Sequence, residues 1–226
     1  AEKYDVSEMT IRRDLDYIKT KNLLENGGNS TNLVLNSEYI FYSEQINHLD
    51  QKERIAQFAI SLIEPDDTLI LDNGTTTSVL AKYIPREKNV TVLCYNYQVL
   101  SQLQSNGNAS IIFAGGYYHP SDQMFDSDEG VSLIKRIRAT KMFVSASGIH
   151  KSLGLTCANN YEVATKRAAL SSSHIKILIA DSSKFGAIRP GFFAELGDID
   201  IIVTDDELDK DWVQSIRELG IKLYLV

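Results

Sequence analysis

The chain has 226 residues, a formal net charge of −7 at neutral pH and 43% hydrophobic residues, enough for one sizeable core and a small additional unit. It contains no apolar run that could span a membrane, and its N-terminus lacks the charged-then-apolar pattern of a signal peptide. The acidic balance excludes a protein that coats nucleic acid over its whole surface, but it is compatible with a small DNA-reading unit attached to an acidic domain.

The first predicted element is a helix that begins near Ser7, a residue suited to capping its N-terminus. Apolar residues recur at helical spacing, at Ile11, Leu15 and Ile18. Thr10, Arg12 and Arg13 lie off this apolar stripe. Such a helix fits the major groove of DNA, where Ser7 and Thr10 in its first turn read base edges and the arginines bind phosphates. An ordinary solvated helix face is the alternative.

A turn over residues 26–30 separates two short apolar segments and is consistent with a small β-wing. Residues 36–50 look like a connector, so we place the domain boundary there. The sequence thus predicts a small first domain over residues 1–35 and a larger second domain over residues 51–226.

The second domain alternates apolar runs with helical patterns. Strands are predicted over residues 68–71, 90–95, 110–114, 141–146, 175–180, 199–204 and 221–226. Helices are predicted over residues 52–63, 75–84, 97–105, 129–138, 161–173 and 207–218. This alternation predicts an α/β fold with a mostly parallel sheet and helices on both of its faces.

The stretch after the first strand indicates an anion site. A short polar turn leads into a helix that opens with hydroxyl groups, in the order Asp72, Asn73, Gly74, Thr75, Thr76 and Thr77. The free N–H groups and the dipole of a helix N-terminus attract a phosphate, and glycine lets the backbone come close to it. An ordinary strand-to-helix turn with threonine as the cap is the alternative.

Other strands are also followed by polar residues, which predicts a polar-ligand site. The loops begin at Asn96, at Gly115 and Gly116, at Ser147, and at Asp181. In an open parallel sheet these loops share one rim, where ligands bind. Any single loop also has a plain structural explanation, for example Asn96 as an Asx-turn, the two glycines as a turn, and Asp181 as a helix cap.

Residues 6–15, Val-Ser-Glu-Met-Thr-Ile-Arg-Arg-Asp-Leu, resemble the recognition helix of the DeoR family of bacterial transcription repressors. The resemblance implies that residues 1–4 end a preceding helix and that the earlier part of a winged helix-turn-helix is missing from this chain. Residues 1–35 would then be a partial DNA-binding domain, expected to bind DNA poorly by itself. Family members usually carry basic residues and a histidine before the Gly-Gly pair, where this chain has Leu24-Glu25-Asn26.

The resemblance extends over the second domain. The family's sensor-domain motifs are matched by Lys52, Asp72, Gly74, Thr75, Thr76, Asn96, Gly115, Gly116, Glu162, Lys166 and Asp181 to Phe185. It implies a fold similar to ribose-5-phosphate isomerase, glucosamine-6-phosphate deaminase and CoA transferases, and an effector that is a phosphorylated sugar. Finer matches, among them His119 and residues 148–150, imply deoxyribose 5-phosphate.

In this scheme the backbone and hydroxyls of residues 74–77 hold the phosphate, and Lys184 or Lys52 adds a charge-assisted contact. Sugar hydroxyls would donate to Asn96, Glu162 and Asp181. These roles have structural alternatives. The two lysines could be solvated surface residues, and Glu162 could be an acid placed in the first turn of its helix, where the dipole favours it. Asp72 would either line the site or brace its loop.

Two other functions are weighed. An isomerase or deaminase would use Asp72, Glu162 or Asp181 as a base and Lys184 as an electrophile, but an enzyme has no use for the recognition-helix fragment. A pure oligomerisation module is disfavoured by the polar rim. The sequence therefore favours a repressor, without catalytic residues, whose partners are a phosphorylated sugar, operator DNA in the full-length protein, and further copies of itself as a homodimer or larger homo-oligomer.

Metal and redox chemistry find no support in the sequence. The four histidines are scattered, and Cys94 and Cys157 lie far apart without metal-type spacing. We expect two buried thiols, no metal, no cofactor, no membrane contact and a cytoplasmic location.

Overall fold

The computed structural model describes residues 44–226. The predicted DNA contacts Ser7, Thr10, Arg12 and Arg13, the predicted wing, the whole of the predicted first domain and most of the connector lie outside the described residues. Within the described part of the chain, every helix is too short or too polar to cross a membrane.

A seven-stranded sheet forms the centre of the described domain, in the order β12-β11-β9-β6-β1-β2-β3. All of its neighbouring strands pair in parallel. Its members are β1 (Thr68–Leu71), β2 (Val90–Cys94), β3 (Ala109–Phe113), β6 (Ala139–Val144), β9 (Ser173–Ile179), β11 (Ile201–Thr204) and β12 (Lys222–Leu225). They are the seven strands predicted from the apolar runs, so the predicted sheet is confirmed.

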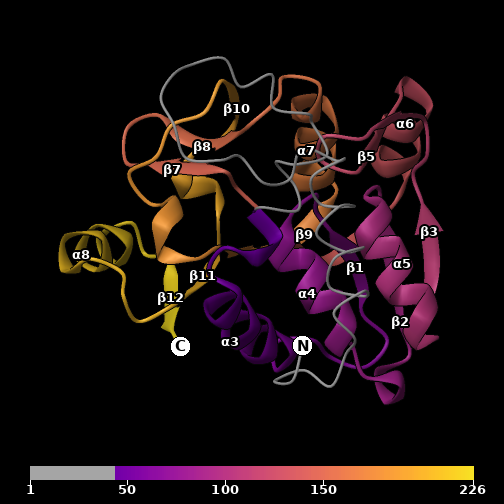
Figure 1. Cartoon of the computed structure of the whole chain (residues 1–226), viewed down its shortest axis with the longest axis horizontal. Coiled ribbons are helices and arrows are strands. Elements are labelled where there is room, and N and C mark those ends of the chain that lie inside the picture. Colours follow the sequence, from indigo (N-terminus) through magenta and orange to yellow (C-terminus); the bar gives the residue numbers. More distant parts are fainter. Residues whose placement is uncertain (1–43) are drawn as a thin grey trace, which may run out of the picture.

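Helices cover both faces of this sheet (Figure 1). One face packs against α3 (Leu49–Ile60), α4 (Thr75–Tyr83) and α5 (Tyr97–Asn106). The other packs against α6 (Asp128–Arg136), α7 (Glu162–Ser171) and α8 (Lys210–Glu218). Single 3₁₀ turns occur at Arg86–Lys88, Ser182–Lys184 and Leu196–Asp198.

The strands are apolar on both faces because both faces are buried. In β1, Leu69 and Leu71 belong to one core and Ile70, between them, belongs to the other. Strand side chains alternate in direction, so a strand between two helix layers must be apolar throughout. Cys94 and Cys157 are both buried and free, as expected, and burial raises the pKa of each thiol to about 12.

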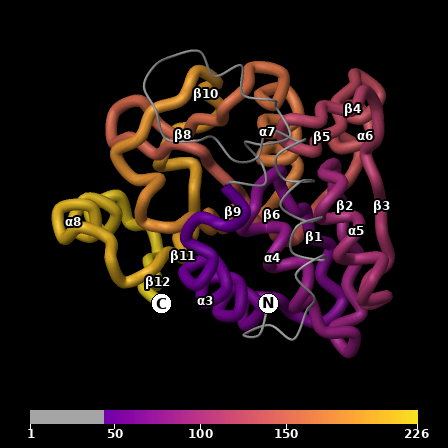
Figure 2. The backbone as a smooth tube through the Cα atoms, viewed as in Figure 1, coloured from indigo at the N-terminus to yellow at the C-terminus, as the bar shows by residue number. Residues whose placement is uncertain are grey.

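Two small antiparallel sheets were not predicted. One is the hairpin of β4 (Tyr117–His119) and β5 (Met124–Asp126), and the other contains β7 (Gly148–His150), β8 (Gly154–Cys157) and β10 (Gly191–Ala194) in the order β10-β8-β7. The hairpin follows β3 and the second small sheet follows β6, so both lie at the carboxyl ends of the parallel strands. Figure 2 shows both at the same end of the domain.

The order of the strands fixes where a ligand can bind. From β1 the chain builds outward through β2 and β3, and then returns to the other side of β1 to add β6, β9, β11 and β12. The loops after β1 and β6 therefore lead away in opposite directions and open a crevice between them. Ligands of open α/β sheets bind in such a crevice.

Candidate functional site

A cavity of about 380 Å³ lies at this crevice. It receives residues from the loops after β1, β6 and β9, from the β4–β5 hairpin and from the start of α7. Its polar and charged walls are formed by Glu44, Asn73, Thr75, Thr76, Ser121, Asp122, Ser145, Ser147, Asn159, Glu162, Asp181, Lys184 and Arg189, with Gly74 contributing backbone. The volume is that of a small-molecule site.

The N-terminus of α4 forms one wall of the cavity. Gly74 precedes the helix, and Thr75 and Thr76 line the cavity in its first turn. The first N–H groups of a helix have no partner inside it and carry its positive dipole end. A Cβ at position 74 would lie 2.1 Å from the Oγ of Ser145, so glycine is required for the loops after β1 and β6 to meet.

Asp72 and Lys166 form a buried ion pair beneath this wall. The Lys166 Nζ lies 2.7 Å from Asp72 Oδ2, and the two side chains are 1% and 0% exposed. Asp72 also accepts hydrogen bonds from the N–H groups of Asn73 and Ser145, at 2.8 and 2.9 Å, and from the Tyr95 hydroxyl. The carboxylate thus joins the loops after β1 and β6 to α7, which is the bracing role considered for it.

Two asparagines continue the network toward the cavity. Asn96 is fully buried, accepts from two N–H groups at the start of α5, and donates to Asn73 Oδ1 at 2.7 Å and to the Asp122 carbonyl at 2.9 Å. The Asn73 amide in turn donates to Glu162 Oε2 at 3.0 Å. Asn73 lines the cavity, whereas Asn96 lies behind it with its hydrogen-bonding groups used inside the protein.

Glu162 and Asp122 are carboxylates of the cavity wall with raised pKa values. Burial raises the pKa of Glu162 despite the opposing charge of Lys166, and the charge of Asp122 adds to the increase. Burial also raises the pKa of Asp122, although Tyr161 donates a hydrogen bond to it at 3.0 Å. Both groups hold protons more tightly than ordinary carboxylic acids and suit hydrogen bonding to a neutral polar ligand.

Asp181 contributes the one carboxylate oxygen of the described wall that is buried without a hydrogen-bond partner. Its Oδ1 accepts from the N–H and hydroxyl groups of Ser183. Its Oδ2 has no partner among the described residues, and the residue is 1% exposed. A buried carboxylate oxygen without a donor is costly, so a ligand donor at this position would be stabilising.

Two cations, Lys184 and Arg189, belong to the described wall. The Lys184 Nζ lies 2.6 Å from Glu44 Oε2. Lys52 is fully buried outside the wall and donates to the carbonyls of Glu44 and Asn47. Burial lowers the pKa of Lys52, and the nearby charge of Asp181 opposes this effect.

The structure divides the predicted site residues into three groups. Seven line the cavity: Asn73, Gly74, Thr75, Thr76, Glu162, Asp181 and Lys184. Four lie outside its wall and hold it: Lys52, Asp72, Thr77 and Asn96. Gly115 and Gly116 also lie outside the wall, and Gly116 forms a turn with φ of +144° against the backbone of Asp126. Ligand contact by any of these residues stays a prediction.

Sequence reasoning missed several cavity residues, namely Glu44, Ser121, Asp122, Ser145, Asn159 and Arg189. Ser145 was placed inside the strand predicted over residues 141–146, but β6 ends at Val144, so Ser145 is the first residue after the strand. Asp122 and Ser121 lie in the unpredicted hairpin, and Glu44 lies in the predicted connector.

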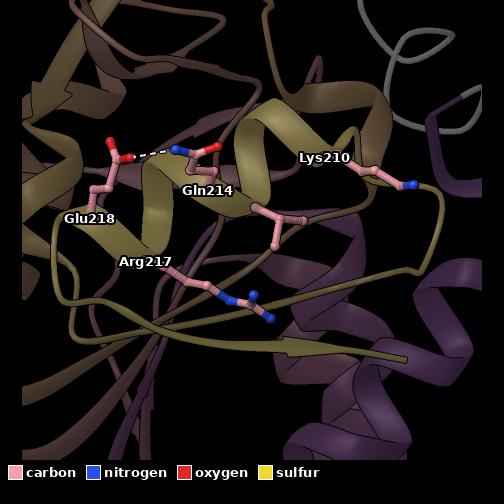
Figure 3. A pocket seen from close by; sticks show the side chains of 5 residues that line it. Lys210, Gln214, Arg217 and Glu218 are labelled. Atoms are coloured by element: carbon pink, nitrogen blue, oxygen red, sulfur yellow. Dashed lines mark hydrogen bonds between the residues drawn. The ribbon is translucent and has the colours of Figure 1, made fainter.

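A second hollow lies along α8 (Figure 3). Its lining comes from one helix: Lys210, Val213, Gln214, Arg217 and Glu218. The Gln214 amide donates to Glu218 at 2.8 Å, so these two groups satisfy each other. Polar groups from different elements do not converge here, and we do not assign this hollow a function.

Comparison with known proteins agrees with the resemblance found in the sequence. Residues 47–206 match the DeoR C terminal sensor domain, and residues 1–30 match the DeoR-like helix-turn-helix domain. The chain is 33% identical over 218 residues to the deoxyribose operon repressor of Escherichia coli K12, which covers 96% of this chain and 86% of the repressor. It is 28% identical over 223 residues to the HTH-type transcriptional regulator IolR of Bacillus subtilis 168, which covers 98% and 89%.

Solved structures with a related arrangement include ribose 5-phosphate isomerase A from Methanocaldococcus jannaschii, with a TM-score of 0.46 and 13% identity over 62% of this chain and 55% of that chain. Another is eIF2B beta from Chaetomium thermophilum, with a TM-score of 0.49 and 16% identity over 68% and 48%. The chain thus spans about half the length of each of these proteins.

The sensor-domain match covers most of the chain, and the two relatives above, a repressor and a transcriptional regulator, align over 86% and 89% of their own length. The chain belongs to the DeoR family of transcriptional regulators and carries the family's C-terminal sensor domain.

Proposed function

We propose that this regulator is a repressor whose sensor domain binds a phosphorylated sugar in the cavity between β1 and β6, and that the sugar is deoxyribose 5-phosphate. The protein would control genes of sugar or nucleoside catabolism. Support for the identity of the sugar comes from the similarity to a deoxyribose operon repressor. Support for the class of ligand comes from the two kinds of group in the cavity wall: a helix N-terminus with cations, and carboxyl groups.

We assign the phosphate to the N-terminus of α4. Thr75 and Thr76 line the cavity in the first turn of that helix, and Lys184 and Arg189 supply positive charge from the loops that follow β9. A phosphate dianion gains charge-assisted hydrogen bonds from such groups. A neutral sugar would leave the two cations without a ligand partner.

We assign the sugar to the carboxyl groups of the wall, and the unpartnered Oδ2 of Asp181 is the observation that carries the proposal. A sugar hydroxyl is a neutral donor of the right size for this oxygen. Asp122 and Glu162, whose pKa values are raised, would contribute further hydrogen bonds. A phosphate placed at these carboxyl groups would find none of the cations that pair with it at Lys184 and Arg189.

As a repressor, the protein must couple this cavity to DNA. The ligand would favour one arrangement of the sensor domains over another, which requires different contacts in the two arrangements. We propose a DNA-binding unit over residues 1–35 and the sensor over residues 51–226. We also propose a homodimer or larger homo-oligomer, which would space reading helices along the operator.

A thermal-shift screen tests the proposal. Deoxyribose 5-phosphate should raise the Tm of the chain, and deoxyribose should not. At a concentration of about 100 Kd, a ligand adds about 2.7 kcal/mol of stability, which is about 5–11 °C for a domain of this size. Hexose and hexitol phosphates are screened in the same way, and a larger Tm increase with one of them would identify a different sugar.

Two variants locate the ligand. Replacing Thr75 and Thr76 together with valine, which keeps their shape, should remove most of the shift. Asp181→Asn should weaken binding of the phosphorylated sugar while leaving binding of inorganic phosphate unchanged. A full shift in the Thr75→Val/Thr76→Val variant would show that the phosphate binds elsewhere, and a preference for the unphosphorylated sugar would refute the proposal.

A further inference from the structure

Glu44 lies at the point where the described sensor domain continues from residues 1–43. Among the residues before α3 that the structure describes, it is the one that lines the cavity. Because Glu44 belongs to the cavity wall, a bound ligand can contact the segment that follows the helix-turn-helix match over residues 1–30.

Two contacts hold this segment in place. The Glu44 carboxylate pairs with Lys184 at 2.6 Å, and its backbone carbonyl accepts a hydrogen bond from the buried Lys52. Lys52 also donates to the Asn47 carbonyl at 2.6 Å, so one buried ammonium fixes the turn that precedes α3.

The Glu44 side chain behaves as an anion bound in a cationic site. Burial would raise its pKa, but the hydrogen bond from Lys184 and the positive charges of Lys184, Lys52 and Arg189 outweigh this effect and lower the pKa. Lys184 and Arg189 are also the two cations of the described cavity wall. A carboxylate of the protein therefore lies where an anionic group of a ligand would find its positive partners.

We propose that the phosphate of the effector and the Glu44 carboxylate compete for Lys184, and that binding of the phosphate displaces Glu44 and loosens residues 44–51. This inference rests on the proposed function, because it needs a phosphorylated ligand in the cavity. It assigns Lys184 to the phosphate subsite and names the segment through which binding reaches the N-terminal part of the chain. A phosphate dianion bound to Lys184 would lie next to the Glu44 carboxylate, and repulsion between these two negative charges favours exchange of one for the other.

Competition makes a specific prediction for Glu44→Gln. Glutamine keeps the size of the side chain and the backbone hydrogen bond from Lys52 but removes the competing charge. The ion pair is partly exposed and worth little, so its loss should tighten deoxyribose 5-phosphate binding about twofold to fivefold. Binding of unphosphorylated deoxyribose should not change. Asp50→Asn removes a charge from the exposed first turn of α3 and serves as the control, with wild-type affinity expected.

Calorimetric titration of the full chain with deoxyribose 5-phosphate, deoxyribose and inorganic phosphate measures these differences. Lys184→Gln should weaken binding of the phosphorylated sugar, and adding Glu44→Gln to it should then give no gain. If wild type fails to bind deoxyribose 5-phosphate, the proposed function fails. If wild type binds it but Glu44→Gln binds equally or more weakly, or gains equally for deoxyribose, the competition is refuted and the proposed function stands.

Hydrogen exchange tests the displacement. The Lys52 N–H donates to the His48 carbonyl at 3.0 Å. Deoxyribose 5-phosphate should speed exchange in the peptide over residues 44–52 of wild type and change it little in Glu44→Gln. Slower exchange of this peptide in wild type would mean that the segment closes over the ligand, which would overturn the inference.

Discussion

Replacing Lys166 with methionine tests whether the buried ion pair with Asp72 holds the site together. The two charged atoms lie 2.7 Å apart and both side chains are almost fully buried. Removing one partner of a buried pair costs about 3–5 kcal/mol, because the remaining charge is left poorly solvated. Asp72 keeps three donors, from Asn73, Ser145 and Tyr95. We therefore expect the lower part of that range, about 3–4 kcal/mol.

For a domain of this size, that loss lowers Tm by about 6–16 °C. Lys141→Met is a matched control, because Lys141 pairs with Asp67 at 2.6 Å at the opposite end of the sheet, where their side chains are 8% and 5% exposed. Both variants should melt earlier. Lys166→Met should also bind deoxyribose 5-phosphate more weakly, whereas Lys141→Met should bind it as wild type does.

The pH dependence provides a second check on Lys166. Burial lowers its pKa, but the charges of Asp72 and Glu162 outweigh burial and raise it above the ordinary value of 10.5. A lysine with a raised folded-state pKa contributes stability that is fully present below 10.5 and is lost as pH rises through the folded-state pKa. The Tm difference between wild type and Lys166→Met should therefore narrow only above pH 10.5. If Lys166→Met melted at the same temperature as wild type at neutral pH, the stabilising role of the Asp72–Lys166 ion pair would be refuted.

Two further predictions concern the cavity wall. Gly74→Ala should lower the free energy of unfolding in urea by about 1–3 kcal/mol, because its Cβ would overlap Ser145. Adding Ser145→Gly should restore most of this loss, since both clashing atoms belong to the Ser145 side chain. A double variant as unstable as Gly74→Ala would contradict this explanation. Glu162 has a raised pKa from burial, so the folded protein keeps its proton after the unfolded chain has lost it, and stability should decline as pH rises above the ordinary value of 4.5. Glu162→Gln should flatten that decline, and an unchanged slope would assign it to other groups.

The sheet and the rim of the site were predictable because they follow from local patterns. Apolar runs such as residues 68–71 mark strands buried on both faces, and parallel pairing then gathers their carboxyl-end loops at one edge. The two small sheets were missed because each of their short strands includes a glycine or a polar residue, so they form neither a continuous apolar run nor a measurable period. Asp122 was missed with them, since it lies in the β4–β5 hairpin.

Which rim residues face the cavity was not predictable. Asn96 and Asn73 are both amides that follow a strand, yet Asn96 is turned inward to cap α5 and Asn73 lines the cavity. The difference depends on partners far away in sequence, such as Glu162 for Asn73. A single sequence shows that a polar side chain lies on the rim, but the hydrogen bonds that it makes depend on the folded loops.

The polar groups of the wall connect separate elements, and this suits a sensor. Asn73 in the loop after β1 donates to Glu162 at the start of α7, and Asp122 in the β4–β5 hairpin accepts from Tyr161, the residue before α7. Glu44 links the segment before α3 to the loop after β9 through Lys184. A ligand that takes over even one of these groups changes how two elements are held. Differential contacts of this kind are what allow a small molecule to favour one arrangement of a protein over another.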